Sequence, residues 1–222
     1  MHVEIIETRP NGSIKRDSLA RWGQSATMKA VERGRIQVYT GDGKGKTTAA
    51  LGLVMRAAGR GLRCAFVQFL KGGWQSGEYV SLERLLPPVP HMRFGRKCRY
   101  ALFPGQPAQD CERCGQCFFD PAAATVEDEA EALFGEAAAA ELLRSGEYDL
   151  LVLDEYSVIL HFSLLSREMA EELLDSRGKC EIVITGRWAP QWLIDRADLV
   201  SEIKEVKHYW KAGLQAREGF EF

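Results

Sequence analysis

The feature that most constrains the fold is a glycine-rich segment, residues 41–48 (GDGKGKTT), between the β-rich run IQVYT at 36–40 and an apolar stretch at 47–61. The first run is typical of a buried strand, and the second of a helix that ends at glycines. Glycines let the backbone turn tightly, so that successive N–H groups converge on anionic oxygens, and the helix N-terminus adds its dipole. The segment therefore predicts a phosphate-binding loop.

Two side chains of this loop carry the expected chemistry, because Lys46 is placed to reach phosphate oxygens and the Thr47 hydroxyl to ligate Mg²⁺. The strict pattern G-x-x-x-x-G-K-[S/T] has its first glycine where this chain has Thr40, so the match is imperfect. The alternative is a glycine-rich turn with an incidental Lys-Thr pair, but the flanking strand and helix favour the loop. We expect the nucleotide to contact Gly41, Asp42, Gly43, Lys44, Gly45, Lys46, Thr47 and Thr48.

A second apolar run, DLLVLDE at 149–155, is predicted to be a buried strand that ends in Asp154 and Glu155. The carboxyl ends of parallel strands meet at one edge of a sheet, where the loop also lies. We therefore expect Thr47, Asp154 and Glu155 to hold or orient Mg²⁺. The alternative for the two carboxylates is an acidic pair that caps a helix.

Strands alternate with helices along the rest of the chain, which predicts an α/β fold with a mainly parallel sheet covered on both faces. We expect a three-layer P-loop NTPase of the RecA-like kind with a Cys-rich inserted loop. Residues 1–34 are predicted to be an N-terminal arm, 35–222 the P-loop domain, and about 93–121 the insert. The further elements expected are strands at 62–70, 179–186 and 199–206, and helices at 125–144 (capped by Thr125 with Asp128), 166–175 and 190–197.

Charge and hydropathy exclude several classes of partner. The formal net charge is −2, which does not favour nucleic acid or an anionic membrane surface. The sequence has no apolar stretch near the roughly 18 residues that span a bilayer, and its first residues do not form a secretory signal. A cytoplasmic location is expected.

Four of the six cysteines fall in the insert, as Cys98-x₁₂-Cys111-x₂-Cys114-Gly-x-Cys117. Two-residue spacers let a turn aim successive sulfurs at one ion, so the cluster predicts a metal site. Structural zinc would stabilise the loop, whereas the Cys-x₂-Cys-Gly-x-Cys run is also similar to half of a ferredoxin cluster site. The other two cysteines, at 64 and 180, lie in apolar runs and are expected to be buried.

Several motifs in this order resemble the ATP:corrinoid adenosyltransferases of cobalamin biosynthesis and salvage. They are YTGDGKGKTTAA (39–50), RAAGRG (56–61), VQFLKG (67–72), VLDE (152–155), ITGR (184–187), VKHY (206–209) and AREGFEF (216–222). The resemblance covers about residues 35–222, except for the cysteine-bearing insert.

The resemblance implies transfer of the 5′-deoxyadenosyl group of ATP to the Co(I) of a reduced corrinoid, which forms adenosylcobalamin and releases triphosphate. Co(I) is the nucleophile, so the protein needs to place C5′ and to neutralise the leaving group. By position in the motifs, Lys46, Glu155 and Arg187 are the expected catalytic residues. Arg56 and Arg187 match basic positions near the nucleotide, and Thr47 and Glu155 match magnesium positions. A homodimer is expected.

Family members shield the lower face of the corrinoid with aromatic side chains, and here the candidates are Phe94, Tyr100 and Phe103, although ordinary packing explains each of them equally well.

Formation of Co(I) requires an electron, which an iron–sulfur cluster could relay. An iron–sulfur cluster is therefore slightly favoured over zinc at the cysteines, with a flavoprotein or another protein as the electron donor.

Two other functions remain open. One is a nucleoside kinase-like phosphotransferase whose inserted loop (lasso) is held together by a metal ion, and in which Glu155 would be the general base. The other is a non-catalytic, ATP-dependent corrinoid-binding protein. The product separates them, because adenosyl transfer releases triphosphate, phosphoryl transfer releases ADP, and a binding protein releases neither.

Overall fold

Parallel strands form the centre of the computed structural model, which describes residues 33–72, 77–85, 87–97, 117–217 and 219–220. In these residues one six-stranded sheet has the order β3-β2-β4-β5-β1-β6, and each pairing of neighbouring strands is parallel. The expected α/β fold with a mainly parallel sheet is therefore confirmed. The strands are β1 (Ile36–Thr40), β2 (Cys64–Gln68), β3 (His91–Arg93), β4 (Leu150–Asp154), β5 (Glu181–Thr185) and β6 (Leu199–Glu202).

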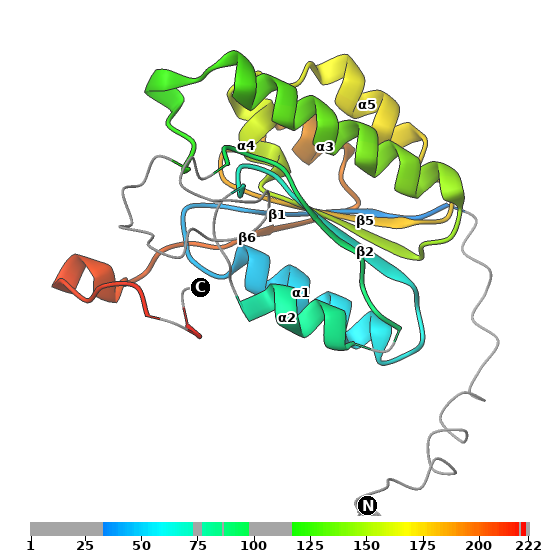
Figure 1. Cartoon of the computed structure of the whole chain (residues 1–222), viewed down its shortest axis with the longest axis horizontal. Helices are drawn as coiled ribbons and strands as arrows, with labels where there is room; N and C mark the ends of the chain where they lie inside the picture. The colour runs from blue at the N-terminus through cyan, green and yellow to red at the C-terminus, as the bar shows by residue number, and fades with distance from the viewer. Residues whose placement is uncertain (1–32, 73–76, 86, 98–116, 218, 221–222) are drawn as a thin grey trace, which may run out of the picture. The chain divides into compact units, whose positions relative to one another are not determined.

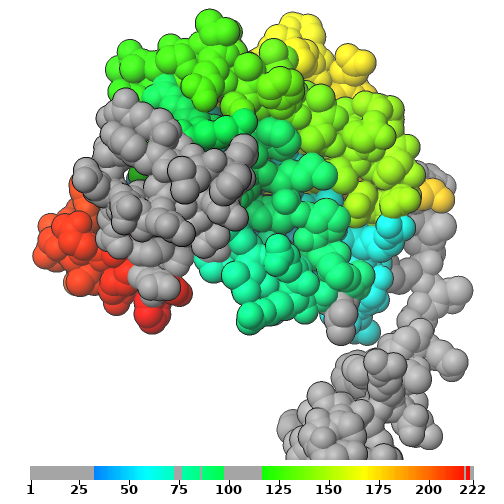
Figure 2. Space-filling model, in the orientation of Figure 1, coloured from blue at the N-terminus to red at the C-terminus, as the bar shows by residue number. Residues whose placement is uncertain are grey.

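Helices cover both faces of the sheet, because its strands alternate their side chains between two apolar clusters. In β4, Leu150 and Val152 belong to one cluster, and Leu151 and Leu153 to the other. Figure 1 shows α1 and α2 on one face and α3, α4 and α5 on the opposite face. In the space-filling view α3 and α5 form the outer surface of the second face (Figure 2). The helices are α1 (Lys46–Ala58), α2 (Gly77–Arg84), α3 (Val126–Ser145), α4 (Tyr156–His161), α5 (Arg167–Asp175) and α6 (Gln191–Arg196).

The longest helix, α3, begins where its local sequence predicts. Thr125 and Asp128 form a capping box, in which each side chain bonds to the backbone N–H of the other residue. Further along, a Cβ atom at Gly135 would lie 2.3 Å from the ring of Phe69, the residue that follows β2. The absence of a side chain at this position therefore lets α3 pack closely against the sheet.

A buried polar pair joins α3 to α4. The Tyr156 hydroxyl donates to the Glu136 carboxylate, with 2.9 Å between the oxygens, and both residues are buried. Burial disfavours the charged carboxylate and raises the pKa of Glu136 to about 7. Burial likewise raises the pKa of Tyr156. The pair is thus a proton-sensitive contact on the face of the sheet opposite α1.

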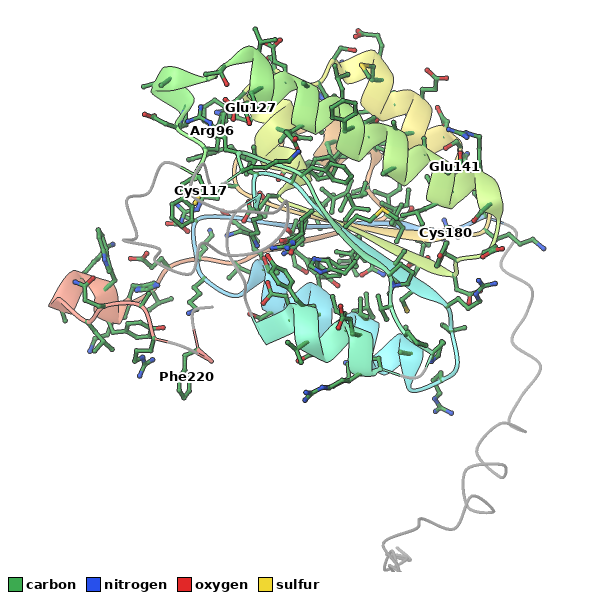
Figure 3. All side chains as sticks on the ribbon, in the orientation of Figure 1. Arg96, Cys117, Glu127, Glu141, Cys180 and Phe220 are labelled. Atoms are coloured by element: carbon green, nitrogen blue, oxygen red, sulfur yellow. The ribbon has the colours of Figure 1, made fainter. Side chains whose placement is uncertain are left out.

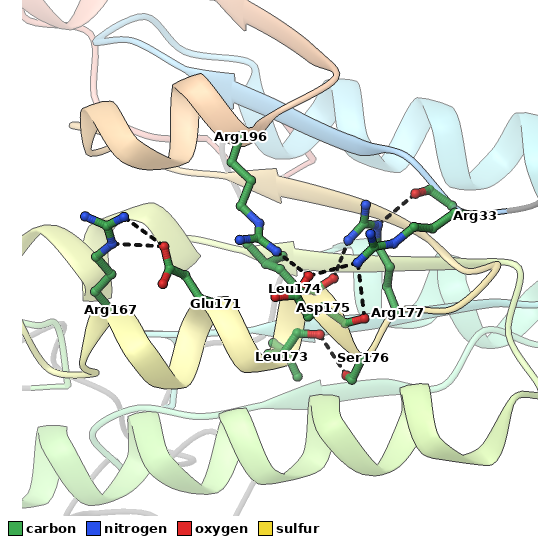
Figure 4. Close-up of polar contacts among 10 residues, drawn as sticks. Arg33, Arg167, Glu171, Leu173, Leu174, Asp175, Ser176, Arg177 and Arg196 are labelled. Carbon is green, nitrogen blue, oxygen red and sulfur yellow. Dashed lines mark hydrogen bonds and ion pairs between the residues drawn. The ribbon is translucent and has the colours of Figure 1, made fainter.

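A second polar cluster fixes the chain where it enters β1 (Figure 4). The buried Arg177 donates to the carbonyl oxygen of Gly34 over 2.7 Å, and Arg33 and Arg196 both contact Asp175 at the end of α5. A Cβ atom at Gly34 would lie 1.8 Å from the Cys180 carbonyl oxygen. These contacts hold the start of β1 against the connection that leads into β5.

The structure differs from the sequence-based expectations mainly in short elements. The sequence analysis gives no helix or strand between residues 70 and 125, but the structure has α2 and β3 there. The strand expected at 199–206 ends at Glu202, because this edge strand is exposed along its whole length and gains little from burial. Residues 1–32, which include most of the expected arm, and residues 98–116 of the insert lie outside the described residues. None of the helices formed by the described residues has the length and hydropathy that crossing a bilayer requires.

Candidate nucleotide site

The glycine-rich loop connects β1 to α1 as expected and depends on glycine at its first turn. Gly41 has a φ of 101° and Gly45 a φ of 117°, values that side-chain-bearing residues rarely adopt. A Cβ atom at Gly41 would also lie 2.4 Å from the carbonyl oxygen of Ile203. The loop therefore turns at Gly41, one residue after Thr40, whose backbone still belongs to β1. This explains how the chain accommodates threonine where the strict pattern has glycine.

Lys46 lies within the curve of the loop. Its side chain is 8% exposed, and its ammonium group donates to the carbonyl oxygens of Gly41 and Gly43 over 2.8 and 2.7 Å. Burial lowers the pKa of Lys46, although the carboxylate of Glu155 opposes that shift. The cation is thus held at the centre of the loop, where a phosphate group would bind.

Asp154 ends β4 and is fully buried. It accepts hydrogen bonds from four side chains, and the pKa of its carboxyl group is lowered because these bonds and the charge of Lys71 outweigh burial. Oxygen Oδ1 accepts from Thr47 and Thr185, and oxygen Oδ2 from Gln68 and Lys71, over 2.6 to 2.8 Å.

Glu155 has a left-handed backbone conformation, with a φ of 62°, and its N–H donates to the Thr185 hydroxyl over 3.1 Å. This conformation is unfavourable by about 1 kcal/mol or more for a residue other than glycine, and such strain clusters at functional sites. Burial and the neighbouring Asp154 raise the pKa of the Glu155 carboxyl group. Unlike Asp154, Glu155 lines a cavity.

That cavity has a volume of about 760 Å³ and lies beside the phosphate loop. A volume of this size is typical of small-molecule and cofactor sites. Residues far apart in the sequence contribute cations, a carboxylate and apolar surface to its lining: Lys44, Lys71, Arg187, Glu155, Met55 and Phe220. The arrangement can therefore hold a polyanion at one end and an organic group beside it.

Most of the predicted loop residues line the cavity, but three other predicted positions do not. Arg56 is exposed on the last turn of α1, outside the lining. Asp154 is fully buried and is absent from the lining. Phe94 packs inward against Phe69, with 6.4 Å between ring centroids. The other two aromatic candidates, Tyr100 and Phe103, lie outside the described residues.

Sequence patterns alone indicate no role for Lys71 or for the C-terminal segment. His208 and Phe220 line the cavity, and the Lys44 ammonium group lies 3.2 Å from the Tyr209 hydroxyl. The Q-F-x-K-G and V-K-H motifs marked both regions, but spacing alone did not show that they reach the loop.

Of the predicted metal-binding cysteines, Cys98, Cys111 and Cys114 lie outside the described residues, and Cys117 is half-buried. In the part of the chain that is described, no three His, Cys, Asp or Glu side chains gather as a metal site. Cys117 and Cys180 lie at opposite ends of the sheet (Figure 3).

The two cysteines expected to be buried, Cys64 and Cys180, are confirmed as core residues. Burial raises the pKa of their thiols to about 11 and about 12. Both thiols therefore stay protonated near neutral pH.

Comparison with known proteins agrees with the motifs. Residues 32–222 match the family described as ATP:corrinoid adenosyltransferase BtuR/CobO/CobP. The chain is 33% identical to the corrinoid adenosyltransferase of Pseudomonas aeruginosa over 192 residues, which covers 86% of this chain and 85% of that protein. It is also 33% identical to the corrinoid adenosyltransferase CobA of Salmonella typhimurium, with 86% and 87% covered. The resemblance seen in the motifs is thereby confirmed, and the chain belongs to the ATP:corrinoid adenosyltransferase family of transferases.

Proposed function

We propose that the protein transfers the 5′-deoxyadenosyl group of ATP to the Co(I) of a reduced corrinoid and releases triphosphate. The observation that carries this proposal is the assembly of the phosphate loop, Glu155 and Arg187 around one cavity. The relatives' names support the class of reaction, and the lining of the cavity supports the way in which ATP would be held.

In this reaction the electron pair of Co(I) forms the cobalt–carbon bond to C5′ while the bond from C5′ to the phosphate oxygen breaks. The electrons of that bond leave with the triphosphate. Loop N–H groups and Lys46 bind the leaving group at the N-terminus of α1, and Arg187 faces the same cavity. The residues of the loop that this assignment includes are Gly41, Asp42, Gly43, Lys44, Gly45, Lys46, Thr47 and Thr48.

The donors for magnesium fit the cavity. The Thr47 hydroxyl and the Glu155 carboxylate both line it, and both are hard oxygen ligands of the kind Mg²⁺ prefers. Magnesium bound there would neutralise charge on the triphosphate. Glu155 lines the cavity together with Thr47, whereas the carboxylate of Asp154 accepts hydrogen bonds from four side chains, Thr47 among them.

The sheet order supports a three-layer, RecA-like P-loop fold, since β5 lies between the loop strand β1 and the carboxylate strand β4. For the corrinoid, Phe94 packs inward, and we retain Tyr100 and Phe103 as candidates for contact with its lower face. We also propose a cytoplasmic location, a homodimer, and a flavoprotein or another protein as electron donor.

The test is the product. Purified protein is incubated with ATP, Mg²⁺ and chemically reduced cobalamin, the visible spectrum is recorded, and the phosphate product is identified. The proposal expects a cobalt–carbon spectrum and one triphosphate per cobalamin. ADP would indicate a phosphotransferase instead, and unchanged ATP would indicate a binding protein.

For the insert we propose one metal bound by Cys98, Cys111, Cys114 and Cys117, as zinc or as an iron–sulfur cluster. The antiparallel bridge between Lys71 and Phe118 places the C-terminal end of this segment beside the exit of β2. Elemental analysis of anaerobically purified protein should find one zinc, or several irons with sulfide, per chain. Replacement of any one of the four by serine should release the metal. Metal-free protein with all four thiols alkylated in the native state would refute the site.

A further inference from the structure

The buried carboxylate of Asp154 has no hydrogen-bonding position to spare for a further ligand. Each of its oxygens accepts two hydrogen bonds, Oδ1 from the hydroxyls of Thr47 and Thr185, and Oδ2 from Gln68 and Lys71. All four distances lie between 2.6 and 2.8 Å, and the side chain is fully buried. This arrangement fixes the carboxylate on both sides.

The backbone restrains Lys71 in addition to its ion pair with Asp154. Lys71 follows Leu70, whose φ is 60°, and its own N–H donates to the Phe94 carbonyl oxygen over 3.1 Å. The next residue, Gly72, lies so close to the chain after β3 that a Cβ atom would be 2.1 Å from the Gly95 carbonyl oxygen. The turn therefore has one geometry, and it directs the ammonium group at Asp154.

Gln68, the second hydrogen-bond donor to Oδ2, is also held in place by a neighbouring side chain. Gln68 donates to Asp154 through its amide nitrogen, and its amide oxygen lies 2.7 Å from Nε2 of His91 on the edge strand β3. With the ring nitrogen as donor, the amide has one orientation. The Oδ2 side of the carboxylate is thus held by β2, β3 and the turn after β2 together.

The fixed position of the Asp154 carboxylate determines the orientation of the Thr47 hydroxyl group. A hydroxyl group has one proton and two lone pairs, so a Thr47 hydroxyl that donates to Asp154 turns its lone pairs away from that carboxylate. Thr47 itself lines the cavity, and a metal ligand needs lone pairs. The orientation of Asp154 therefore decides whether Thr47 presents lone pairs or a proton to the cavity.

We propose that Lys71 is a positioning residue of the magnesium–triphosphate site: it holds Asp154 so that Asp154 orients the Thr47 hydroxyl. This rests on the proposed function, in which that site holds the triphosphate of ATP. Asp154 then acts through Thr47, and the magnesium ligands from the protein are Thr47 and Glu155. The competing role for Lys71 is direct contact with phosphate, because its side chain is one-third exposed and lines the same cavity.

A double-mutant cycle separates the two roles. Lys71→Met, Asp154→Asn and the double variant are compared with the wild type for binding of a fluorescent ATP analogue, with saturating Mg²⁺ and with EDTA. Mn²⁺ affinity of each ATP complex is measured by electron paramagnetic resonance. Lys97→Met is the matched control, because it removes an ion-paired lysine that does not line the cavity.

Under the proposal, Lys71→Met weakens Mn²⁺ binding roughly tenfold, as expected for a lost charged hydrogen bond, and changes ATP binding in EDTA less than about twofold. The double variant is no worse than Asp154→Asn alone. Lys71→Arg recovers part of the loss, and Lys97→Met changes nothing.

Equal weakening with Mg²⁺ and with EDTA would instead assign Lys71 to direct phosphate contact and overturn the proposal, as would additive effects in the double variant. Should Asp154→Asn fail to fold, the comparison of Mg²⁺ with EDTA in Lys71→Met still decides. These are binding measurements, so a failure of the adenosyl transfer assay would leave their outcome intact.

Discussion

The ammonium group of Lys46 has both a structural and a proposed functional role in the phosphate loop. It bonds to two carbonyl oxygens of its own loop, and under the proposed function the same cation binds phosphate. Lys46→Ala should therefore lower nucleotide-dependent turnover by about 100-fold, because a charged hydrogen bond contributes about 1.5–3 kcal/mol. The free energy of unfolding should fall by only about 1–2 kcal/mol, since the loop keeps its hydrogen bond from the Gly43 N–H to the Ile203 carbonyl oxygen.

The measurement pairs steady-state turnover at saturating cobalamin with denaturant unfolding. Lys179→Ala, which truncates an exposed lysine that is absent from the cavity lining, is the control and should match the wild type in both. Wild-type turnover in Lys46→Ala at ordinary ATP concentrations would contradict the phosphate-loop assignment.

At this scale the sequence motifs identified four residues that the structure brings to one cavity. Lys46, Thr47, Glu155 and Arg187 all line the cavity, as their motifs indicated. The sequence did not indicate the contact of Lys71 with Asp154, because the two residues lie 83 positions apart. A one-dimensional pattern does not specify which carboxylate faces which lysine across a sheet.

Between elements, the contact of α3 with α4 makes stability depend on pH. The folded-state pKa of Glu136, about 7, lies above the ordinary glutamate value of 4.5, so folding favours the protonated carboxyl group. This contribution is fully present below pH 4.5 and is lost as the pH rises through about 7. At 1.36 kcal/mol for each pKa unit, the full effect is about 3 kcal/mol.

Glu136→Gln should remove that dependence while keeping an acceptor for the Tyr156 hydroxyl. Denaturant unfolding from pH 5 to 8.5 should show the variant gaining stability relative to the wild type as the pH rises. Glu141→Gln is the control, since Glu141 is exposed on the same helix. Parallel pH profiles for wild type and Glu136→Gln would show that the pair does not titrate in this range.

Elements with strong local signals were predicted, and weak ones were not. The signals for the capping box and for the length of α3 lie in residues close together in the sequence. The start of α3 at Val126 was therefore expected to within one residue. By contrast, α2 buries a single residue, Leu82, and β3 has three residues on the edge of the sheet. Such elements form because neighbouring segments hold them, and their own sequences carry little periodicity.

Across the whole molecule, the C-terminal segment completes the cavity that begins at the first strand. The Lys44 ammonium group contacts the Tyr209 hydroxyl and, over 3.1 Å, the Phe220 carbonyl oxygen. Deletion of residues 208–222 should therefore raise the Kd for ATP by about tenfold, because one wall of the cavity and two charged hydrogen bonds are lost.

Tripolyphosphate supplies the internal comparison. Lys46 and the loop N–H groups remain after the deletion. The affinity of the protein for tripolyphosphate, measured by calorimetry, should therefore fall much less than its affinity for ATP. Tyr209→Phe, which removes one hydroxyl, should give a smaller loss than the deletion. Unchanged ATP affinity after the deletion would show that the segment does not contribute to the site.

The order of strands in the sheet has a consequence for biosynthesis. β5 separates β1 from β4, so the phosphate loop and Asp154 reach each other only across a strand made after both of them. Folding through parallel, non-local strand pairing is slow, because the entropy cost of closing long loops precedes the stabilising contacts between the strands. A ribosome-bound chain that has not yet released β5 therefore has no nucleotide site, and ATP cannot assist its folding until late in translation. Nucleotide capture by stalled nascent chains of increasing length would report the moment at which the central strand inserts.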